Sequence, residues 1–444
     1  MRTFFTIAFG QFISLVGSSL TGFALGIWVF QETGSVTLLS LIFMMAMVPG
    51  TILAPFAGAL VDRGDRKTIM LLADSVAAVT TLAVALLVLT GRQELWNIFV
   101  LVTVGSVAKT FQVPAYVASV PLLVPKRHLG RAVGLAQLNQ AMATALAPLL
   151  AGFLIARVGI GGVLIIDLAT FVVAMMTLLV VRIPRPEESE AGRQAKGSLG
   201  HEVASGWRYI RARPGFIGLL MVFTSVGFIL AMANVLYVPL LLSFTSSEVL
   251  GLTVSAGGVG LAIGSLLVVT RGVPERKVLT VMVLLFAGGI LMSATGFQRS
   301  AIPIAVILLT MMVTVPVARG AYQVLWQTKV PPDMQGRVIA LRNMLAQCSP
   351  PAAYLLAGPL ADRVFEPFMT RPEAVSTFAG RLLGAGPGRG IALMFVLAGL
   401  IIALIAVLGY LHPRIRNLEQ ELPDAVDETT FRPAAPPAPE PAQS

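Results

Sequence analysis

The sequence has few charged residues and almost no cysteine. Of its 444 residues, 12% are charged and 56% are hydrophobic, whereas soluble domains carry about 25% charged residues. A chain with so little charge has to bury its apolar excess in lipid, which excludes the soluble enzymes. The single cysteine, Cys348, excludes an intrachain disulfide, and we expect it to be free and buried.

Cofactor and catalytic patterns are also missing. The three histidines, His128, His201 and His412, do not have the spacing of a zinc site. The sequence contains no G-x-x-x-x-G-K-[ST] phosphate loop and no metalloprotease or serine-hydrolase motif. We therefore expect no cofactor, no metal and no enzymatic activity, and any work must be driven by an ion gradient or by the substrate's own gradient.

Long apolar runs of about 20 residues, the length of a bilayer span, divide the chain. They predict an all-α integral membrane protein with twelve transmembrane helices in two pseudo-symmetric six-helix halves. The first six runs cover residues 4–30, 36–61, 69–90, 95–118, 132–156 and 160–181. The second six cover residues 216–244, 249–270, 278–297, 302–324, 338–361 and 391–411.

A polar stretch punctuated by proline and glycine separates the two halves. The predicted parts are an N-terminal half (1–181), a cytoplasmic linker (182–213), a C-terminal half (214–416) and a disordered cytoplasmic tail (417–444). Within the linker, residues 199–210 carry Trp207 and Tyr209 and predict a short amphipathic helix at the membrane surface.

Lysine and arginine are concentrated in alternate segments between the runs and in both tails. Their excess over the opposite segments is about three to one, and positive loops stay in the cytoplasm. We therefore expect a bacterial inner-membrane protein with both termini inside. The net charge of +10 is then explained by basic residues that fix the topology and contact anionic lipid. No nucleic-acid partner is therefore expected.

An internal repeat supports the two halves. At an offset of 206 residues, Ala115-Tyr116 aligns with Ala321-Tyr322, Val124-Pro125 with Val330-Pro331, and Gly130-Arg131 with Gly336-Arg337. The fourth and fifth helices should therefore correspond to the tenth and eleventh.

The loop after the second run reads Gly58-Ala-Leu-Val-Asp62-Arg63-Gly64-Asp65-Arg66-Lys67. It resembles the G-x-L-a-D-r-x-G-r-k signature of the major facilitator superfamily, with Asp65 where a glycine is usual. Gly58 is expected to permit close helix packing, and Asp62 to take a helix N-terminus or a cation. The basic residues Arg63, Arg66 and Lys67 fix topology. The alternative is a positive-inside loop and nothing more.

Two further motifs narrow the resemblance. In the fifth run, the segment with Ala147, Pro148 and Gly152 is similar to the g-x-x-x-G-P-x-x-G-G motif of drug/proton antiporters. In the fourth, Lys109-Thr-Phe-Gln112 stands where those antiporters carry R-x-x-q, whose basic residue is implicated in proton coupling. Segments 166–171 and 358–367 look like the bacterial branch that holds macrolide-efflux proteins and enterobactin exporters.

The resemblance implies a secondary exporter of small amphipathic molecules, such as drugs, macrolides or siderophore-like compounds. It would work as a monomer by alternating access, with protons as the coupling ion. A lipid-handling protein, such as a lysophospholipid flippase, or a non-transporting membrane scaffold is the alternative. A cavity that opens sideways to lipid would favour that alternative.

Ionisable side chains inside apolar spans are costly and indicate function. By the resemblance, the first, fourth, seventh and tenth helices line the pathway, so Lys109 and Arg319 should face it and Asp74 and Asp167 should not. Asp167 is interpreted as either a proton site or a structural acceptor. Asp74 is expected to pair with the loop arginines in an inner gate, and Arg342 to extend to the cytoplasmic face.

The first helix carries a polar stripe. Gln11, Ser14, Ser18 and Thr21 fall within an arc of about 80° on a helix, so they should face a cavity or neighbouring helices. We assign these four residues, with Gln112, to the substrate or proton pathway.

The hexad G-x-L-x-D-R occurs at Gly58 and again at Gly358. Because inverted repeats place related helix ends on opposite faces, we predict an inner latch between Asp62 and the start of the eleventh helix. Asp362 and Arg363 would form an outer latch. The alternative is that D-R is a common way to end a span.

The predicted cavity helices carry two cations, Lys109 and Arg319, and one carboxylate, Glu32, at the outer rim. An unpaired cation at low dielectric is costly. We therefore expect an acidic or zwitterionic amphiphile as the substrate rather than a strongly cationic drug.

Overall fold

A computed structural model describes residues 2–125, 128–181, 199–422 and 425. The N-terminal half contains five helices: α1 (Arg2–Thr33), α2 (Val36–Arg63), α3 (Arg66–Leu89), α4 (Leu95–Leu123) and α5 (Leu129–Val180). Helix α5 is 52 residues long and is interrupted at Gly159, whose φ of 67° is left-handed. Glycine adopts that conformation at little cost, so α5 forms two arms, which correspond to the fifth and sixth predicted spans.

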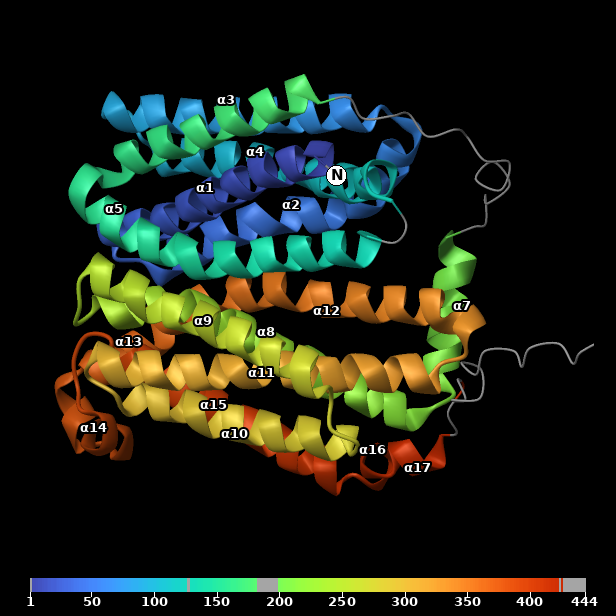
Figure 1. The fold of residues 1–444 in the computed structure, drawn as a ribbon. Helices are drawn as coiled ribbons and strands as arrows, with labels where there is room; N and C mark the ends of the chain where they lie inside the picture. Colours follow the sequence, from blue (N-terminus) through green and yellow to red (C-terminus); the bar gives the residue numbers. More distant parts are fainter. Residues whose placement is uncertain (1, 126–127, 182–198, 423–424, 426–444) are drawn as a thin grey trace, which may run out of the picture.

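The C-terminal half follows α7, which runs from Leu199 to Arg211. Its long helices are α8 (Pro214–Leu242), α9 (Ser247–Arg271), α10 (Lys277–Phe297), α11 (Ala301–Lys329), α12 (Pro332–Leu360) and α15 (Arg389–Leu411). Short elements complete it: η2 (Ala361–Phe365), α13 (Glu366–Thr370), η3 (Pro372–Ser376), α14 (Phe378–Leu383), α16 (Pro413–Arg416) and α17 (Leu418–Glu421). Figure 1 shows the two halves side by side, with their long helices nearly parallel.

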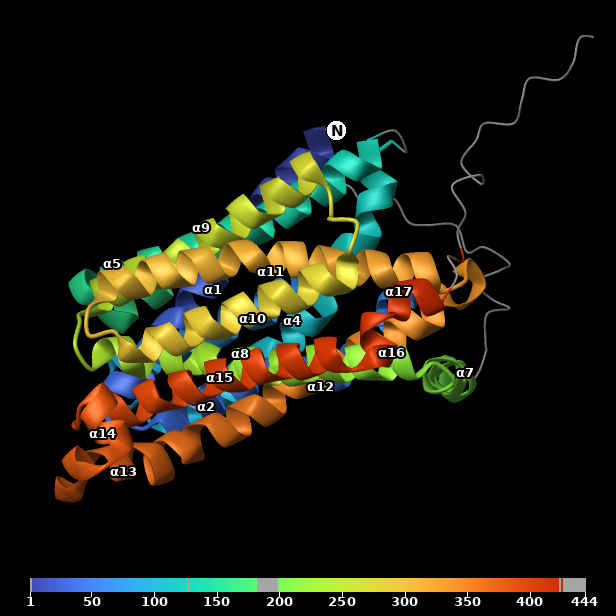
Figure 2. The ribbon, with the colours of Figure 1, turned by 90° about the horizontal axis from the view of Figure 1, so that it is seen from below.

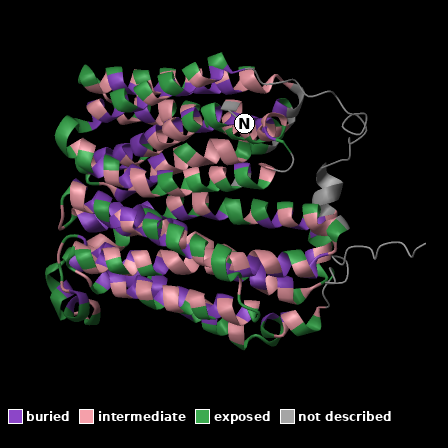
Figure 3. Ribbon diagram, in the orientation of Figure 1, coloured by how far each residue is buried: buried purple, intermediate pink, exposed green. Residues whose placement is uncertain are grey.

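Ten helices of the described chain are long and apolar enough to cross a membrane. With the second arm of α5 and with α12, the described helices account for each of the twelve predicted spans. Large apolar side chains cover the outside, and Val180, Val269 and Ile302 are 79–82% exposed. Figure 3 shows such exposed positions along the outward faces of the helices. Lipid is the solvent that suits this surface, and the predicted all-helical membrane fold is confirmed.

The repeat is visible in the helices themselves. Helices α4 and α11 both contain 29 residues, and their first and last residues are each separated by the offset of 206 found in the sequence. The prediction that the fourth and tenth helices correspond is therefore confirmed.

The predicted surface helix exists as α7. It lies across the ends of the long helices, roughly at right angles to them (Figures 1 and 2). Ile210 is fully buried against the C-terminal half, whereas Trp207 is 42% exposed. The remainder of the predicted linker, residues 182–198, lies outside the described residues.

The start of the predicted disordered tail is ordered. In α17, Leu418 is buried, and the Glu419 carboxylate accepts a hydrogen bond from the Val278 backbone N at 2.6 Å. Lys329 donates to the Glu419 carbonyl at 2.7 Å. An apolar anchor and free groups at neighbouring helix ends thus hold the chain as far as Leu422, which corrects the prediction. Residues 423–424 and 426–444 lie outside the described part.

Cys348 is exposed, so the expectation that it is buried was wrong. Helix α12 buries the face that holds Arg342 and Ser349, and the 100° rotation per residue places Cys348 off that face.

The helix bundle has two ends. The N-terminus, the α2–α3 loop, α7 and α17 lie at one end, which we call the terminal face, and α13 and α14 lie at the other, which we call the opposite face (Figure 1).

Candidate functional site

Asp362 joins the two halves at the opposite face. Its carboxylate accepts hydrogen bonds from Ser35 Oγ at 2.8 Å and from the backbone N atoms of Val36 at 3.0 Å and Thr37 at 2.8 Å. These groups are the N-terminus of α2, where a negative charge is stabilised by free N–H groups and the helix dipole. Arg363 is exposed and takes no part, so only Asp362 of the predicted outer pair makes this contact.

Gly358 permits that approach. A Cβ at this position would overlap the Thr37 backbone, so a larger residue would push α12 away from α2. Nearby, Glu366 accepts hydrogen bonds from the backbone N atoms of Gly388 at 3.1 Å and Ile391 at 3.0 Å. Burial raises the pKa of the Glu366 carboxyl above its ordinary value.

The antiporter-like motif lies at a second contact between the halves. A Cβ on Gly152 of α5 would overlap the Ser247 carbonyl oxygen, and one on Gly251 of α9 would overlap that of Pro148. Ala147 beside them is buried. Small residues therefore let α5 and α9 approach at backbone distance.

Arg66 and Lys67, at the start of α3, bind backbone carbonyls in the last turns of other helices of the N-terminal half. Arg66 donates to the Ala118 carbonyl in α4 at 2.5 Å, and Lys67 donates to the carbonyls of Leu179 and Val181 at 3.0 and 2.6 Å. Cations are favoured at helix C-termini, where carbonyl groups lack partners.

Asp65 has a local role. Its side chain accepts a hydrogen bond from the Thr68 backbone N at 3.1 Å and caps α3. Among the described residues, a Cβ on Gly58 would meet no atom within 4 Å, so this part of the structure shows no close helix packing at Gly58. The side chains of Asp62 and Arg63 lie outside the described residues, and the inner latch stays a prediction.

Asp74 forms an amide network instead of an ion pair. Its buried carboxylate accepts from Gln11 Nε2 at 3.3 Å and from Gln112 Nε2 at 2.5 Å. Gln112 also donates to Gln11 Oε1 at 2.8 Å. The expected pairing of Asp74 with the loop arginines is wrong for the described Arg66, because that side chain reaches the end of α4 instead.

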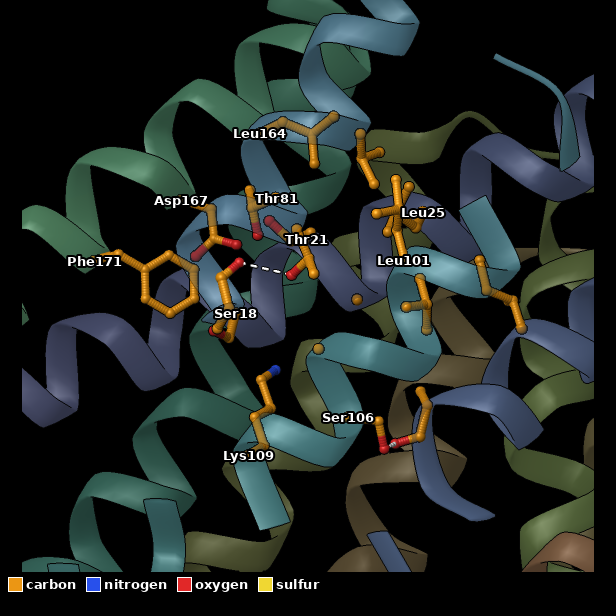
Figure 4. Close-up of a pocket in the computed structure, with 18 of the residues that line it drawn as sticks. Ser18, Thr21, Leu25, Thr81, Leu101, Ser106, Lys109, Leu164, Asp167 and Phe171 are labelled. Carbon is orange, nitrogen blue, oxygen red and sulfur yellow. Dashed lines mark hydrogen bonds between the residues drawn. The ribbon is translucent and has the colours of Figure 1, made fainter. Parts of the chain in front are cut away.

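A cavity of about 190 Å³ in the N-terminal half brings together four of the predicted pathway residues. Ser18, Thr21, Lys109 and Asp167 line it, from α1, α4 and the second arm of α5. Asp167 is 1% exposed, whereas Lys109 lies deep in the bundle with its side chain exposed to the cavity. In Figure 4 the Lys109 amine points toward the side where Ser18 and Asp167 lie.

Hydroxyl groups surround the Asp167 carboxylate. Thr170 donates to Asp167 Oδ1 at 3.2 Å, and Thr21 and Thr81 bring two more hydroxyls to it (Figure 4). The opposite charges of Lys109 and Asp167 attract each other across the cavity. Thr81 and Thr170 were not assigned to this site from the sequence, although Thr170 lies one helical turn from Asp167.

The resemblance implied that Asp167 lies away from the pathway, whereas the structure places Asp167 on the wall of the cavity that Lys109 also lines. A Cβ on Gly17 would overlap the Thr170 hydroxyl and would come within 2.7 Å of Asp167 Oδ1. The absence of a side chain at Gly17 thus lets α1 pack closely enough on α5 for Asp167 to reach the cavity. Ser14, on the same stripe, is buried and is not among the residues lining the cavity.

A larger cavity of about 650 Å³ is lined mainly by α8, α10, α11 and α12 of the C-terminal half, and Met47 of α2 also contributes to its wall. Arg319 is exposed along its wall. Arg342 is 7% exposed, and its guanidinium lies over the rings of Tyr322 and Trp326, 5.1 and 5.8 Å from their centroids. The expectation that Arg342 extends to the membrane surface was wrong, because aromatic rings and amides hold it inside.

Two amide side chains complete this wall. Arg342 Nη2 donates to Gln323 Oε1 at 2.7 Å and to Asn343 Oδ1 at 3.0 Å. Sequence reasoning missed both amides, since neither lies in a motif.

Two helical halves joined at one face, with cavities that hold a few polar and charged side chains inside the apolar bundle, are typical of a membrane transporter. The profile of the Major Facilitator Superfamily matches residues 7–354, and the chain belongs to that superfamily. It is therefore a multi-pass secondary transporter and not an enzyme.

Similar proteins support this assignment. The chain is 26% identical to macrolide efflux protein A of Streptococcus pyogenes, over 94% of this chain and 97% of that one. It is 24% identical to the multidrug efflux pump Tap of Mycolicibacterium fortuitum, over 93% and 96%. A bacterial homolog of the human lysosomal transporter Spinster, solved in an inward-facing and unoccupied conformation, superposes with a TM-score of 0.67 at 14% identity, covering 95% of this chain and 98% of that one.

Proposed function

We propose that this protein exports small amphipathic molecules from the bacterial cytoplasm, with drugs and macrolides among its substrates. The observation that carries the proposal is similarity to a macrolide efflux protein and a multidrug efflux pump along more than nine-tenths of each chain. The larger cavity, of about 650 Å³, is within the usual size range of small-molecule sites. Siderophore-like compounds belong to the same chemical range.

The contacts between the halves suggest how access alternates. The positive-inside rule places the terminal face in the cytoplasm, so the joined opposite face is the outer one. Export then requires Asp362 to leave the N-terminus of α2, and α5 and α9 to separate at Gly152 and Gly251. The inner latch at Asp62 would close the cytoplasmic side in return.

We further propose that protons drive the cycle through Asp167. Protonation would remove the charge that attracts Lys109 and would leave the ammonium without a counter-charge. Because α1, α4 and α5 carry these groups, the loss changes how the three helices pack, and a proton thereby biases one conformation over the other. The hydroxyls of Thr21, Thr81 and Thr170 can accommodate both forms of the carboxyl group, since a hydroxyl donates and accepts.

Accumulation in whole cells tests export. Expression in a bacterium without its own efflux pumps should lower the accumulation of a macrolide and of an amphipathic dye, and an uncoupler should restore both. Accumulation equal to the empty-vector control for both compounds would reject export. Transfer of lysophospholipid between leaflets in proteoliposomes would then test the lipid-handling alternative.

Thiol labelling tests the orientation. In a Cys348→Ser background, an impermeant reagent should label Glu32→Cys, Glu248→Cys and Arg381→Cys in intact cells. Arg276→Cys on the terminal face should react only after permeabilisation. The reverse pattern would contradict the orientation.

A further inference from the structure

The C-terminal cavity holds two guanidinium groups and no acid to balance them. Arg319 and Arg342 both line it. Among the described residues that form its wall, none is aspartate or glutamate. Buried positive charge without a counter-charge is costly in an apolar bundle, so this wall favours an anion.

The surroundings of Arg342 are polar but neutral. Gln323 and Asn343 accept its hydrogen bonds, and two aromatic rings lie beneath its guanidinium. Its Nη1 is buried without a hydrogen-bond partner in the described part of the chain. The side chain is thus held in place by dipoles and π-faces, while its full charge remains uncompensated.

Arg319 is placed to act with it. Tyr322 and Gln323 follow Arg319 by three and four residues on α11, so the three side chains share one face of that helix. Tyr322 and Gln323 are also among the residues that contact Arg342. The two guanidinium groups therefore belong to one wall of the cavity, and Arg319 is the more accessible of them.

We infer that this cavity binds the anionic group, a carboxylate or a phosphate, of an amphiphilic substrate through Arg319 and Arg342. The inference rests on the proposed export function and names its substrate class. Arginine suits planar and phosphate anions because its N–H groups form a fork. Apolar wall residues such as Leu230, Leu285 and Met311 can take the hydrophobic part, and about 650 Å³ is within the usual range of small-molecule sites.

Binding of a matched series to the purified full chain in lipid nanodiscs tests the site. The probes are 2-naphthylacetate, 2-naphthylethanol and 2-naphthylethylamine, which differ in charge but share the ring system. Calorimetry should find the acid bound about tenfold or more tightly than the alcohol, the factor expected of charge-assisted hydrogen bonds, and the amine bound most weakly.

Two variants should abolish the preference for the acid over the alcohol and the amine. Arg319→Gln removes one charge, and Gln323→Glu supplies Arg342 with an internal carboxylate of nearly the same shape, so folding should be preserved. Arg271→Gln, at the exposed end of α9, should keep the wild-type order. Equal affinity of the wild type for acid and alcohol, or an acid preference that survives both variants, would overturn the inference.

Competition separates the sources of the anion. If lysophosphatidic acid displaces 2-naphthylacetate at lower concentration than a soluble aromatic acid does, a lipid headgroup is the preferred anion; the reverse order assigns a soluble acid. Either result retains the site, whereas displacement by neither overturns it. An acid preference in a protein that leaves both macrolide and dye accumulation at the empty-vector level would reject the proposed export function and retain this site.

Discussion

The two cavities differ in how they balance positive charge. In the N-terminal half, Lys109 shares a cavity of about 190 Å³ with Asp167, whereas in the C-terminal half Arg319 and Arg342 line about 650 Å³ without an acid among the described wall residues. Where a carboxylate faces the cation, protonation of that carboxylate removes the counter-charge. Cations without one need an anion from outside. The difference suggests that one half couples to protons and the other selects the substrate.

A second contrast lies within the N-terminal half. Asp74 and Asp167 are both 1% exposed. Asp74 is held by the amides of Gln11 and Gln112, which carry no charge to switch, while Asp167 faces a lysine across a cavity. Burial alone therefore does not distinguish the two carboxylates, and the facing lysine is the reason for proposing Asp167 rather than Asp74 as the proton site.

The largest effect is expected from Asp167→Asn. If Asp167 is the coupling carboxylate, its loss should lower the uncoupler-sensitive efflux ratio by about 5–150-fold, the usual range of coupling between two ligands. Asp74→Asn is the matched control, and it should keep uncoupler-sensitive efflux. Uptake into everted vesicles, which corresponds to efflux from the cell, measures both variants. If efflux by Asp167→Asn still depended on the proton gradient, Asp167 would not be the coupling carboxylate.

A double-mutant cycle with Lys109→Gln measures the interaction energy between Lys109 and Asp167. Because Lys109 and Asp167 attract each other, the double variant Lys109→Gln/Asp167→Asn should be less destabilised than the sum of the single variants. An interaction of about 0.5–3 kcal/mol is expected, measured by unfolding in detergent. The pair Arg319→Gln and Asp167→Asn spans the two halves and should be additive. If the destabilisations of Lys109→Gln and Asp167→Asn were additive, the two side chains would not interact, and Lys109 would have no part in proton coupling.

A smaller effect is expected from Asp362→Asn. The amide has one accepting oxygen, so the cap on α2 should weaken by about 1 kcal/mol, the net contribution of a hydrogen bond. Because this contact joins both halves, export of acidic and neutral substrates should change by the same factor in a vesicle assay. Arg363→Gln should change neither, since Arg363 is exposed and lies outside the contact. Unequal effects on the two substrates would mean that the outer contact itself selects charge.

The fold was largely predictable because lipid imposes it. Span length and hydropathy are local properties, so the apolar runs located the helices, and the offset of 206 reappears in α4 and α11. The division of α5 into two arms depends on a single residue of positive φ, Gly159. Nothing in its surrounding sequence distinguishes it from the other glycines.

The site was less predictable because it depends on the directions of side chains. Resemblance placed Lys109 on the pathway, and helical periodicity placed Ser18 and Thr21 on one face. The location of Asp167 followed from the close approach of α1 and α5 at Gly17, a contact 150 residues apart in sequence. The inward position of Arg342 likewise required Tyr322 and Gln323 from another helix.

The N-terminal cavity is proposed to couple transport to protons, and the C-terminal cavity to select the charge of the substrate. This division is tested most directly by measuring both proton-driven transport and binding preference for two variants in one proteoliposome preparation. Asp167→Asn should lose proton-driven uptake of 2-naphthylacetate into inverted proteoliposomes but should still bind this acid more tightly than 2-naphthylethanol. Gln323→Glu should lose that preference but should keep proton-driven transport of the alcohol. If either variant loses both properties while remaining folded, the two cavities act as one site and the division is contradicted.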